Sequence, residues 1–155
     1  MAKDKLYICV DFDGTCTTHD YPMIGQEIGA IPVLKKLVAE GHMLIIFTMR
    51  SGKQLAEAVK WFEDNEIKLF GIQTNPTQKH WTSSPKAYGH LYIDDAALGC
   101  PLKIDKAKSD RPFVDWDQVR TTLIESGIIQ WKEVEAKDVD INKVTVKHIK
   151  PEDNV

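Results

Sequence analysis

The sequence predicts an α/β fold in which helices flank a mainly parallel, Rossmann-like sheet in three layers. Short apolar runs alternate with segments of helical periodicity over the first 100 residues, and this alternation favours a parallel sheet with right-handed crossovers. Polar residues directly follow three of the apolar runs. Because ligands of such sheets bind beyond the carboxyl ends of the strands, these polar residues mark the expected site.

Four apolar segments are predicted to be the strands. Residues 6–12 are almost continuously apolar, as expected for a parallel strand that is covered on both faces. Residues 42–49, 67–72 and 90–95 follow the same pattern. The intervening residues 73–88 lack it, and we expect a loop there with at most one helical turn.

Three further segments have the spacing and end signals of helices. In the first, Pro32 suits the opening turn and Gly41 is placed to end the helix. In the second, Ser51 and Gln54 form a capping-box pattern before an apolar stripe. The third is predicted to begin at Asp115 and to end at a glycine twelve residues later.

The length of 155 residues fits one domain with a substantial core. We place the catalytic domain at residues 1–127. The pattern weakens over residues 128–155, which we interpret as a C-terminal extension: an edge hairpin, a dimer contact or a partly ordered tail. Whether the chain forms homo-oligomers is left open by the sequence.

Charge and cysteine content restrict the expected partners and compartment. A net charge of −3 gives no general attraction to nucleic acid or to anionic membranes, and no run is long enough to cross a bilayer. The charged start does not have the pattern of a signal peptide. Three cysteines without paired spacing favour a reducing, cytoplasmic setting; Cys16, near the expected site, is more typical of a bystander than of a reactive thiol.

Four aspartates at two strand ends are the candidate metal ligands. Asp11 and Asp13 lie at the end of the first strand, and Asp94 and Asp95 end the fourth. Their like charges would repel one another unless a cation intervened, and a set of oxygen ligands favours Mg²⁺. Such an ion would also allow a phosphate dianion to approach a negative pocket.

Phosphoryl transfer suits this pair of strand ends. A carboxylate can attack phosphorus to form an aspartyl-phosphate, and a second carboxylate in another environment can act as acid and then as base. Gly14 permits the sharp turn that would direct backbone amides at a phosphoryl group.

Further side chains are expected to bind the phosphate or the rest of the substrate. Thr48 ends the second strand and offers a hydroxyl donor, and Lys86 precedes the fourth strand, with Lys79 as the alternative lysine. Arg50 and Ser51 follow Thr48 on the same loop and are candidates for substrate contacts, although the serine could serve only as a helix cap.

The ordered set DxDGT at 11–15, Thr48, Lys86 and Asp94–Asp95 resembles the haloacid dehalogenase (HAD) superfamily over roughly residues 6–100. The resemblance implies that Asp11 is the nucleophile and Asp13 the acid/base, with the threonine and the lysine binding the phosphoryl group.

The same resemblance implies the metal site and the absence of a cap. Asp94 would hold Mg²⁺ together with Asp11 and the backbone carbonyl of Asp13, and Asp95 would ligate or support it. Residues 14–30 and 73–85, where many members insert a cap domain, leave room only for loops. The chain therefore resembles capless members, which often take large substrates or use a neighbouring subunit as a lid.

We therefore expect a Mg²⁺-dependent phosphomonoester hydrolase for a small phosphorylated metabolite, such as a sugar phosphate or a nucleotide. A phosphatase of nucleic-acid ends is an alternative, disfavoured by the lack of a basic, aromatic-rich surface. A receiver-like switch module uses similar residues, but Lys86 precedes the last acidic pair here, whereas the lysine comes last in that class.

Overall fold

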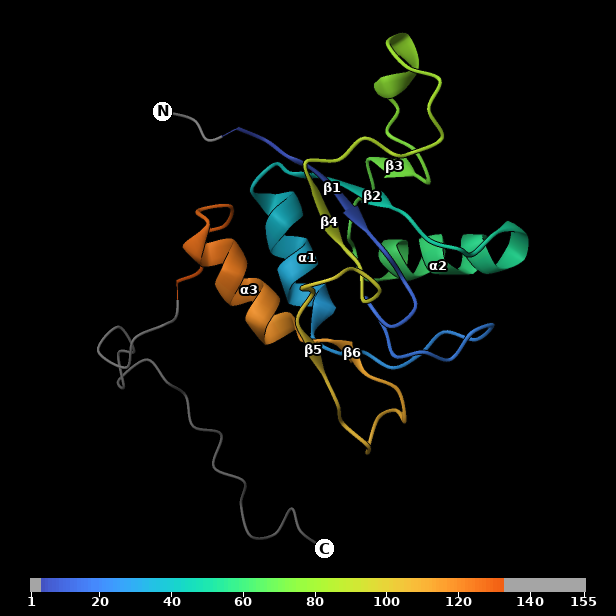
Figure 1. Cartoon of the computed structure of the whole chain (residues 1–155), viewed down its shortest axis with the longest axis vertical. Coiled ribbons are helices and arrows are strands. Elements are labelled where there is room, and N and C mark those ends of the chain that lie inside the picture. Colours follow the sequence, from blue (N-terminus) through green and yellow to red (C-terminus); the bar gives the residue numbers. More distant parts are fainter. Residues whose placement is uncertain (1–3, 133–155) are drawn as a thin grey trace, which may run out of the picture.

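The structure, a computed structural model, describes residues 4–132 and has an α/β architecture (Figure 1). Four parallel strands form one sheet in the order β3-β2-β1-β4. The strands are β1 (Tyr7–Val10), β2 (Met43–Ile46), β3 (Gly71–Ile72) and β4 (Leu91–Ile93). This confirms the predicted fold class, with β1 in the interior of the sheet.

The register of the strands determines which residues meet at the carboxyl edge. Val10 pairs with Ile46 on one side and with Ile93 on the other. The amide of Asp11 then donates to the carbonyl of Ile93 at 3.0 Å, which extends the ladder by one residue. The residues that follow β1, β2 and β4 consequently emerge at one edge of the sheet.

Three helices cover one face of the sheet: α1 (Ala30–Ala39), α2 (Gly52–Asp64) and α3 (Trp116–Glu125). Figure 1 shows α1 and α3 side by side. All three contribute to one apolar core, which also contains the inward-facing strand residues Ile8, Val10, Leu44, Ile46 and Ile93. The alternation of the strand side chains directs these residues to the helices.

A thinner layer covers the other face. Cys9 and Ile45 pack there against Ala87, in the segment that includes the 3₁₀ helix η1 (Gln78–His80). The buried side chain of Gln78 holds this segment together. Its Nε2 donates to the carbonyl of Lys86 at 3.0 Å, and its Oε1 accepts from the amide of Tyr88 at 2.8 Å. The predicted loop with one helical turn is confirmed.

Helix ends follow the sequence signals except at α2. Gly41 follows α1 with φ 89°, and Asp115 caps α3 by accepting from the amides of Asp117 and Gln118. Ser51 does stand at the N-cap of α2, but its side chain makes no cap hydrogen bond. The predicted capping box is therefore wrong. Ser51 is instead exposed at the surface.

An antiparallel hairpin, β5 (Leu102–Lys103) with β6 (Phe113–Val114), was not predicted. It is short, and its strands lack the apolar alternation that identifies longer ones. The hairpin and the start of α3 hold the turn after β1: the amide of Val114 donates to the carbonyl of Gly14 at 3.0 Å, and the indole of Trp116 donates to the carbonyl of Thr15 at 2.6 Å.

The described chain continues past α3 to residue 132. Ile129 is buried in the main core, and the amide of Gln130 donates to the carboxylate of Glu40. The first part of the predicted C-terminal extension thus packs on the domain. Residues 133–155, for which a hairpin, a dimer contact or a tail was considered, lie outside the described residues.

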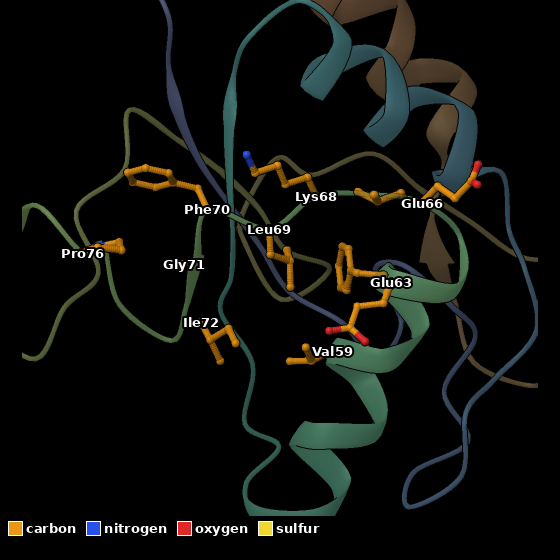
Figure 2. Close-up of a pocket in the computed structure, with 11 residues that line it drawn as sticks. Val59, Glu63, Glu66, Lys68, Leu69, Phe70, Gly71, Ile72 and Pro76 are labelled. Carbon is orange, nitrogen blue, oxygen red and sulfur yellow. The ribbon is translucent and has the colours of Figure 1, made fainter.

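Strand β3 is shorter than the predicted 67–72, because only Gly71 and Ile72 pair with β2 and Gln73 then turns the chain at φ 63°. A groove of about 760 Å³ runs between this edge strand and the C-terminal half of α2 (Figure 2). It is lined mainly by apolar side chains and includes none of the four aspartates.

Both positions at which a cap could be inserted hold loops. Within residues 4–132, the segment 14–29 contains only isolated bridges, and 73–90 contains only η1. The described part of the chain is therefore capless. No helix in it is both long and apolar enough to span a membrane.

Candidate functional site

Three of the four predicted aspartates meet at the carboxyl edge of the sheet. Each of Asp11, Asp94 and Asp95 offers one carboxylate oxygen, and these oxygens lie within 4.8 Å of one another. All three side chains are half-buried. Three hard oxygen donors converging from two strand ends fit a Mg²⁺ ion, which would remove their mutual repulsion.

A buried hydroxyl joins the two halves of this cluster. Oγ of Thr15, which is fully buried, lies 2.8 Å from Oδ2 of Asp11 and 3.2 Å from Oδ1 of Asp95. It also accepts from the amide of Asp95 at 3.1 Å. Because a hydroxyl has a single proton, it donates to one carboxylate at a time, and the shorter distance favours Asp11.

The environment of Asp11 makes its negative charge costly. Burial is the main cause that raises the pKa of its carboxyl to about 8, and contact with Asp95 and the charge of Asp94 act in the same direction. The hydrogen bond from Thr15 opposes this shift. A cation held by the three carboxylates would compensate the charge and favour the ionised form of Asp11.

The turn after β1 packs against a histidine that the sequence analysis did not identify as part of the site. Nε2 of His19 lies 2.9 Å from Oδ2 of Asp95, so the loop that follows the turn folds back against the site. Gly14, at φ 74°, leaves the space for this ring: an added Cβ would lie 2.0 Å from Nε2 of His19. The predicted need for glycine here has both a conformational and a steric cause.

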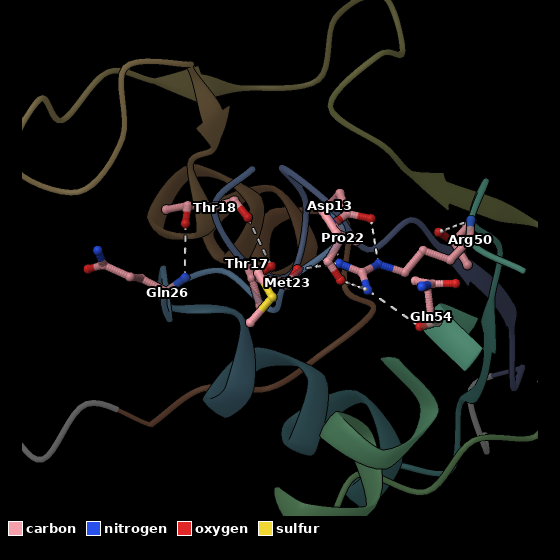
Figure 3. A network of polar contacts seen from close by, with 9 residues as sticks. Asp13, Thr17, Thr18, Pro22, Met23, Gln26, Arg50 and Gln54 are labelled. Atoms are coloured by element: carbon pink, nitrogen blue, oxygen red, sulfur yellow. Dashed lines mark hydrogen bonds and ion pairs between the residues drawn. The ribbon is translucent and has the colours of Figure 1, made fainter. Parts of the chain in front are cut away.

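Asp13 has a different partner from Asp11. Its Oδ2 accepts from Nε of Arg50 at 2.8 Å, and its Oδ1 accepts from Nη2 at 2.7 Å (Figure 3). This bidentate, charge-assisted geometry occupies both carboxylate oxygens. The Asp13 carboxylate is not part of the converging group formed by Asp11, Asp94 and Asp95, and the predicted role of the Asp13 backbone carbonyl as a ligand stays a prediction.

Arg50 is placed differently from the position expected of a substrate contact. The residue is 2% exposed, and Cζ of its guanidinium lies 5.0 Å from the ring centroid of Phe12 and 5.3 Å from that of Tyr21. It points inward, while the neighbouring Met49 is 97% exposed. Its interaction in the structure is with the protein and chiefly with Asp13.

Thr48 is held by a side chain from the end of β3. Oε1 of Gln73 accepts from the amide of Thr48 at 2.8 Å, and Nε2 of Gln73 donates to its carbonyl. The Thr48 hydroxyl accepts from the amide of Arg50 at 3.1 Å. No acceptor among residues 4–132 takes the proton of this hydroxyl, so it can be donated to a phosphate oxygen.

The two candidate lysines lie on the face of the sheet that carries η1. Nζ of Lys86 is 5.7 Å from the ring centroid of Tyr92, and Lys79 belongs to η1. Both side chains are exposed, and neither forms an ion pair with any residue of the described range 4–132. The choice of Lys86 over Lys79 stays a prediction.

Cys16 is close to the site but chemically protected. It is fully buried, its Sγ donates to the carbonyl of Asp11 at 3.2 Å, and burial raises the pKa of its thiol well above the ordinary value. A thiol in this state is a poor nucleophile. The interpretation of Cys16 as a bystander fits its surroundings.

Comparison with known proteins gives a structural relative. A solved structure, described as that of a conserved protein coded by a locus of Bacteroides thetaiotaomicron, is 32% identical to this chain with a TM-score of 0.65. The match covers 79% of this chain and 93% of that one. No family model matches the chain, and no curated protein matches it. The likeness carries no statement of activity.

Proposed function

We propose that this chain, which belongs to the same family as the conserved Bacteroides thetaiotaomicron protein, is a HAD-type, Mg²⁺-dependent phosphomonoester hydrolase that works through an aspartyl-phosphate. The observation that carries the proposal is the convergence of Asp11, Asp94 and Asp95, with their oxygens within 4.8 Å, beside the turn built by DxDGT. A bound divalent ion would supply charge neutralisation to the carboxylates and to the phosphate.

The residues of the chain support a two-step displacement. A carboxylate oxygen of Asp11 attacks phosphorus, the bond from phosphorus to the leaving oxygen breaks, and Asp13 gives its proton to that oxygen. Water then attacks the phosphorus of the aspartyl-phosphate, Asp13 takes a proton from this water, and the Asp11 carboxylate is released. Each oxygen of Asp13 accepts one hydrogen bond from Arg50, and the proton would be carried at a lone pair that these two bonds leave unused.

The phosphoryl group would be held by groups at the same edge of the sheet. The Thr48 hydroxyl retains its proton, and the first amides of α2 have no side-chain cap, so both can donate to phosphate oxygens. Lys86 is the proposed cation for the developing charge. Each of these roles depends on the substrate approaching along the strand ends.

A small phosphorylated metabolite is the proposed substrate class. A net charge of −3 gives a polyanion no general attraction, which favours a small substrate. The described chain has no cap, so the site could also admit a larger substrate, and the substrate panel below therefore includes oligonucleotides. A reducing, cytoplasmic location is proposed on the basis of three cysteines, all free within the described range.

The test is phosphate release across a panel of sugar phosphates, nucleotides and 5′- or 3′-phosphorylated oligonucleotides, with added Mg²⁺. The Asp11→Asn variant should release none while keeping its fold by circular dichroism, and Asp64→Asn, a surface change on α2, should match the wild type. EDTA should stop turnover. A switch module would instead take up one phosphoryl group and release little phosphate, and activity retained by Asp11→Asn would refute the nucleophile.

A further inference from the structure

Every N–H of the Arg50 guanidinium has a partner in the structure. Besides the two bonds to Asp13, Nη2 donates to the carbonyl of Met23 at 2.6 Å, and Nη1 donates to the carbonyls of Pro22 and Gln54 at 3.2 and 3.4 Å (Figure 3). A guanidinium has five N–H donors in a fixed planar arrangement, so this set leaves none unused.

These partners come from three separate segments. Asp13 belongs to the turn after β1, Pro22 and Met23 form the tip of the loop that follows it, and Gln54 lies in the first turn of α2. The backbone of Arg50 adds a fourth segment, because its carbonyl accepts from Nε2 of Gln73 at 3.1 Å, at the end of β3.

The loop tip held by Arg50 belongs to the wall of the site. Two hydrogen bonds join the ends of the loop formed by residues 18–26. The amide of Thr18 donates to the carbonyl of Gln26, and the amide of Gln26 donates to the Thr18 hydroxyl. Within this loop, His19 contacts Asp95 of the acidic cluster. Arg50 therefore links the position of this wall to the position of the Asp13 carboxylate.

A purely packing role is a poor explanation of such a residue. Burying a guanidinium costs free energy that its ion pair and hydrogen bonds must offset, and apolar side chains of similar volume usually fill a core at no such cost. The exposed side chains of Pro22 and Met23 also contribute little apolar burial that could hold the loop without Arg50.

We propose that Arg50 is a positioning residue, which fixes the Asp13 carboxylate and the 18–26 loop in one arrangement beside the acidic cluster. This loop then serves as a wall of the site in a chain whose described residues form no cap. The proposal rests on the proposed phosphatase function. It assigns Arg50 to the protein side of the site and not to the substrate, in contrast to the role expected from its place in the sequence.

Arg50→Lys tests the proposal, because lysine keeps the charge but cannot bind Asp13 in a bidentate manner. We expect kcat to fall by about 10²-fold, the effect of misplacing a catalytic group. KM and the Mg²⁺ concentration for half-maximal activity should stay within about threefold, because the acidic cluster itself is untouched. Hydrogen exchange should become faster at the amide of Met23, which now donates to the carbonyl of Asp20.

Three controls make the outcome decisive. Lys53→Ala removes an exposed cation three residues after Arg50, which forms an ion pair with Glu57, and should leave kcat unchanged. In an Asp13→Asn background, Arg50→Lys should cost little further rate, because its effect passes through Asp13. A thermal melt of each variant measures stability, so that a loss of fold is separated from a loss of positioning.

Specific results would overturn the proposal. Wild-type kcat in Arg50→Lys would exclude a positioning role, and a rise in KM with unchanged kcat would return Arg50 to substrate binding. Equal losses of kcat in the Asp13 and Asp13→Asn backgrounds would show that Arg50 acts independently of Asp13. If the wild type itself releases no phosphate, the proposed function fails, and the exchange of Met23 still reports whether Arg50 holds the loop.

Discussion

The hydroxyl of Thr15 donates to Oδ2 of Asp11 across 2.8 Å, and it does so from a fully buried position between the two strand ends that carry the acidic cluster. Thr15 was part of the DxDGT motif but received no role from the sequence. Its contacts make it the link between the proposed nucleophile and Asp95.

We predict that Thr15→Val weakens Mg²⁺ binding and phosphate release, whereas Thr15→Ser preserves both. Valine has nearly the shape of threonine but removes the hydrogen bond that lowers the pKa of Asp11. It also leaves the amide of Asp95 without its acceptor, at a cost of about 1–3 kcal/mol in the free energy of unfolding. Isothermal titration with Mg²⁺ and a denaturant melt measure the two effects, and equal affinities for the two variants would contradict the prediction.

The raised pKa of Asp11 predicts how pH affects the metal-free protein. The folded carboxyl has a pKa of about 8 and the ordinary value is 3.8, so between these values the folded form holds a proton that the unfolded chain has lost. The free energy of unfolding should therefore decrease as pH rises from about 4 to about 8 and change no further from this cause above it.

Denaturant melts at pH 5 and pH 8 in EDTA measure this dependence, and Asp11→Asn should reduce it. Mg²⁺ binding should show the opposite trend, strengthening by up to about tenfold per pH unit below 8, because the ion displaces the proton. The same pH dependence in the wild type and in Asp11→Asn would mean that another group is responsible.

Lys86→Ala is predicted to reduce kcat by about 10²–10³-fold, the range found when a single group that stabilises transition-state charge is removed. Lys79→Ala is the matched control, since Lys79 is also exposed in the segment between β3 and β4. Because neither lysine reaches the aspartates in the structure, the comparison is made at saturating substrate. A larger loss of kcat in Lys79→Ala than in Lys86→Ala would assign the phosphate-binding role to Lys79.

Gly14→Ala should destabilise the protein more than Gly99→Ala and should also reduce activity. Both glycines have a positive φ, 74° and 87°, which costs an alanine about 1–2 kcal/mol. Only at Gly14 does the new Cβ also meet a neighbour, the ring of His19 at 2.0 Å, whereas nothing lies within 4 Å of it at Gly99. The difference between the thermal melts of the two variants measures the steric cost at Gly14, since both variants have the conformational cost. Phosphate release measures the effect on activity.

Comparison of sequence and structure shows which features local patterns can reveal. The proximity of Asp11 and Asp94 could be predicted from the sequence, because the apolar runs define parallel strands and the carboxyl ends of such strands share an edge. The inward direction of Arg50 could not be predicted, because three of its five donors bind backbone carbonyls. Every residue has a backbone carbonyl, so the sequence does not indicate which ones accept these bonds. His19 was missed for a related reason: its contact depends on how the 18–26 loop folds back.

The indole of Trp116 donates to the carbonyl of Thr15 across a sequence separation of 101 residues. A shortened polypeptide that stops near residue 100 would contain the whole recognisable signature of the site and yet lack the strut that supports its first loop. The smallest unit that keeps this support and the core around it must therefore extend through α3 to about Ile129, well past the last residue that the signature includes.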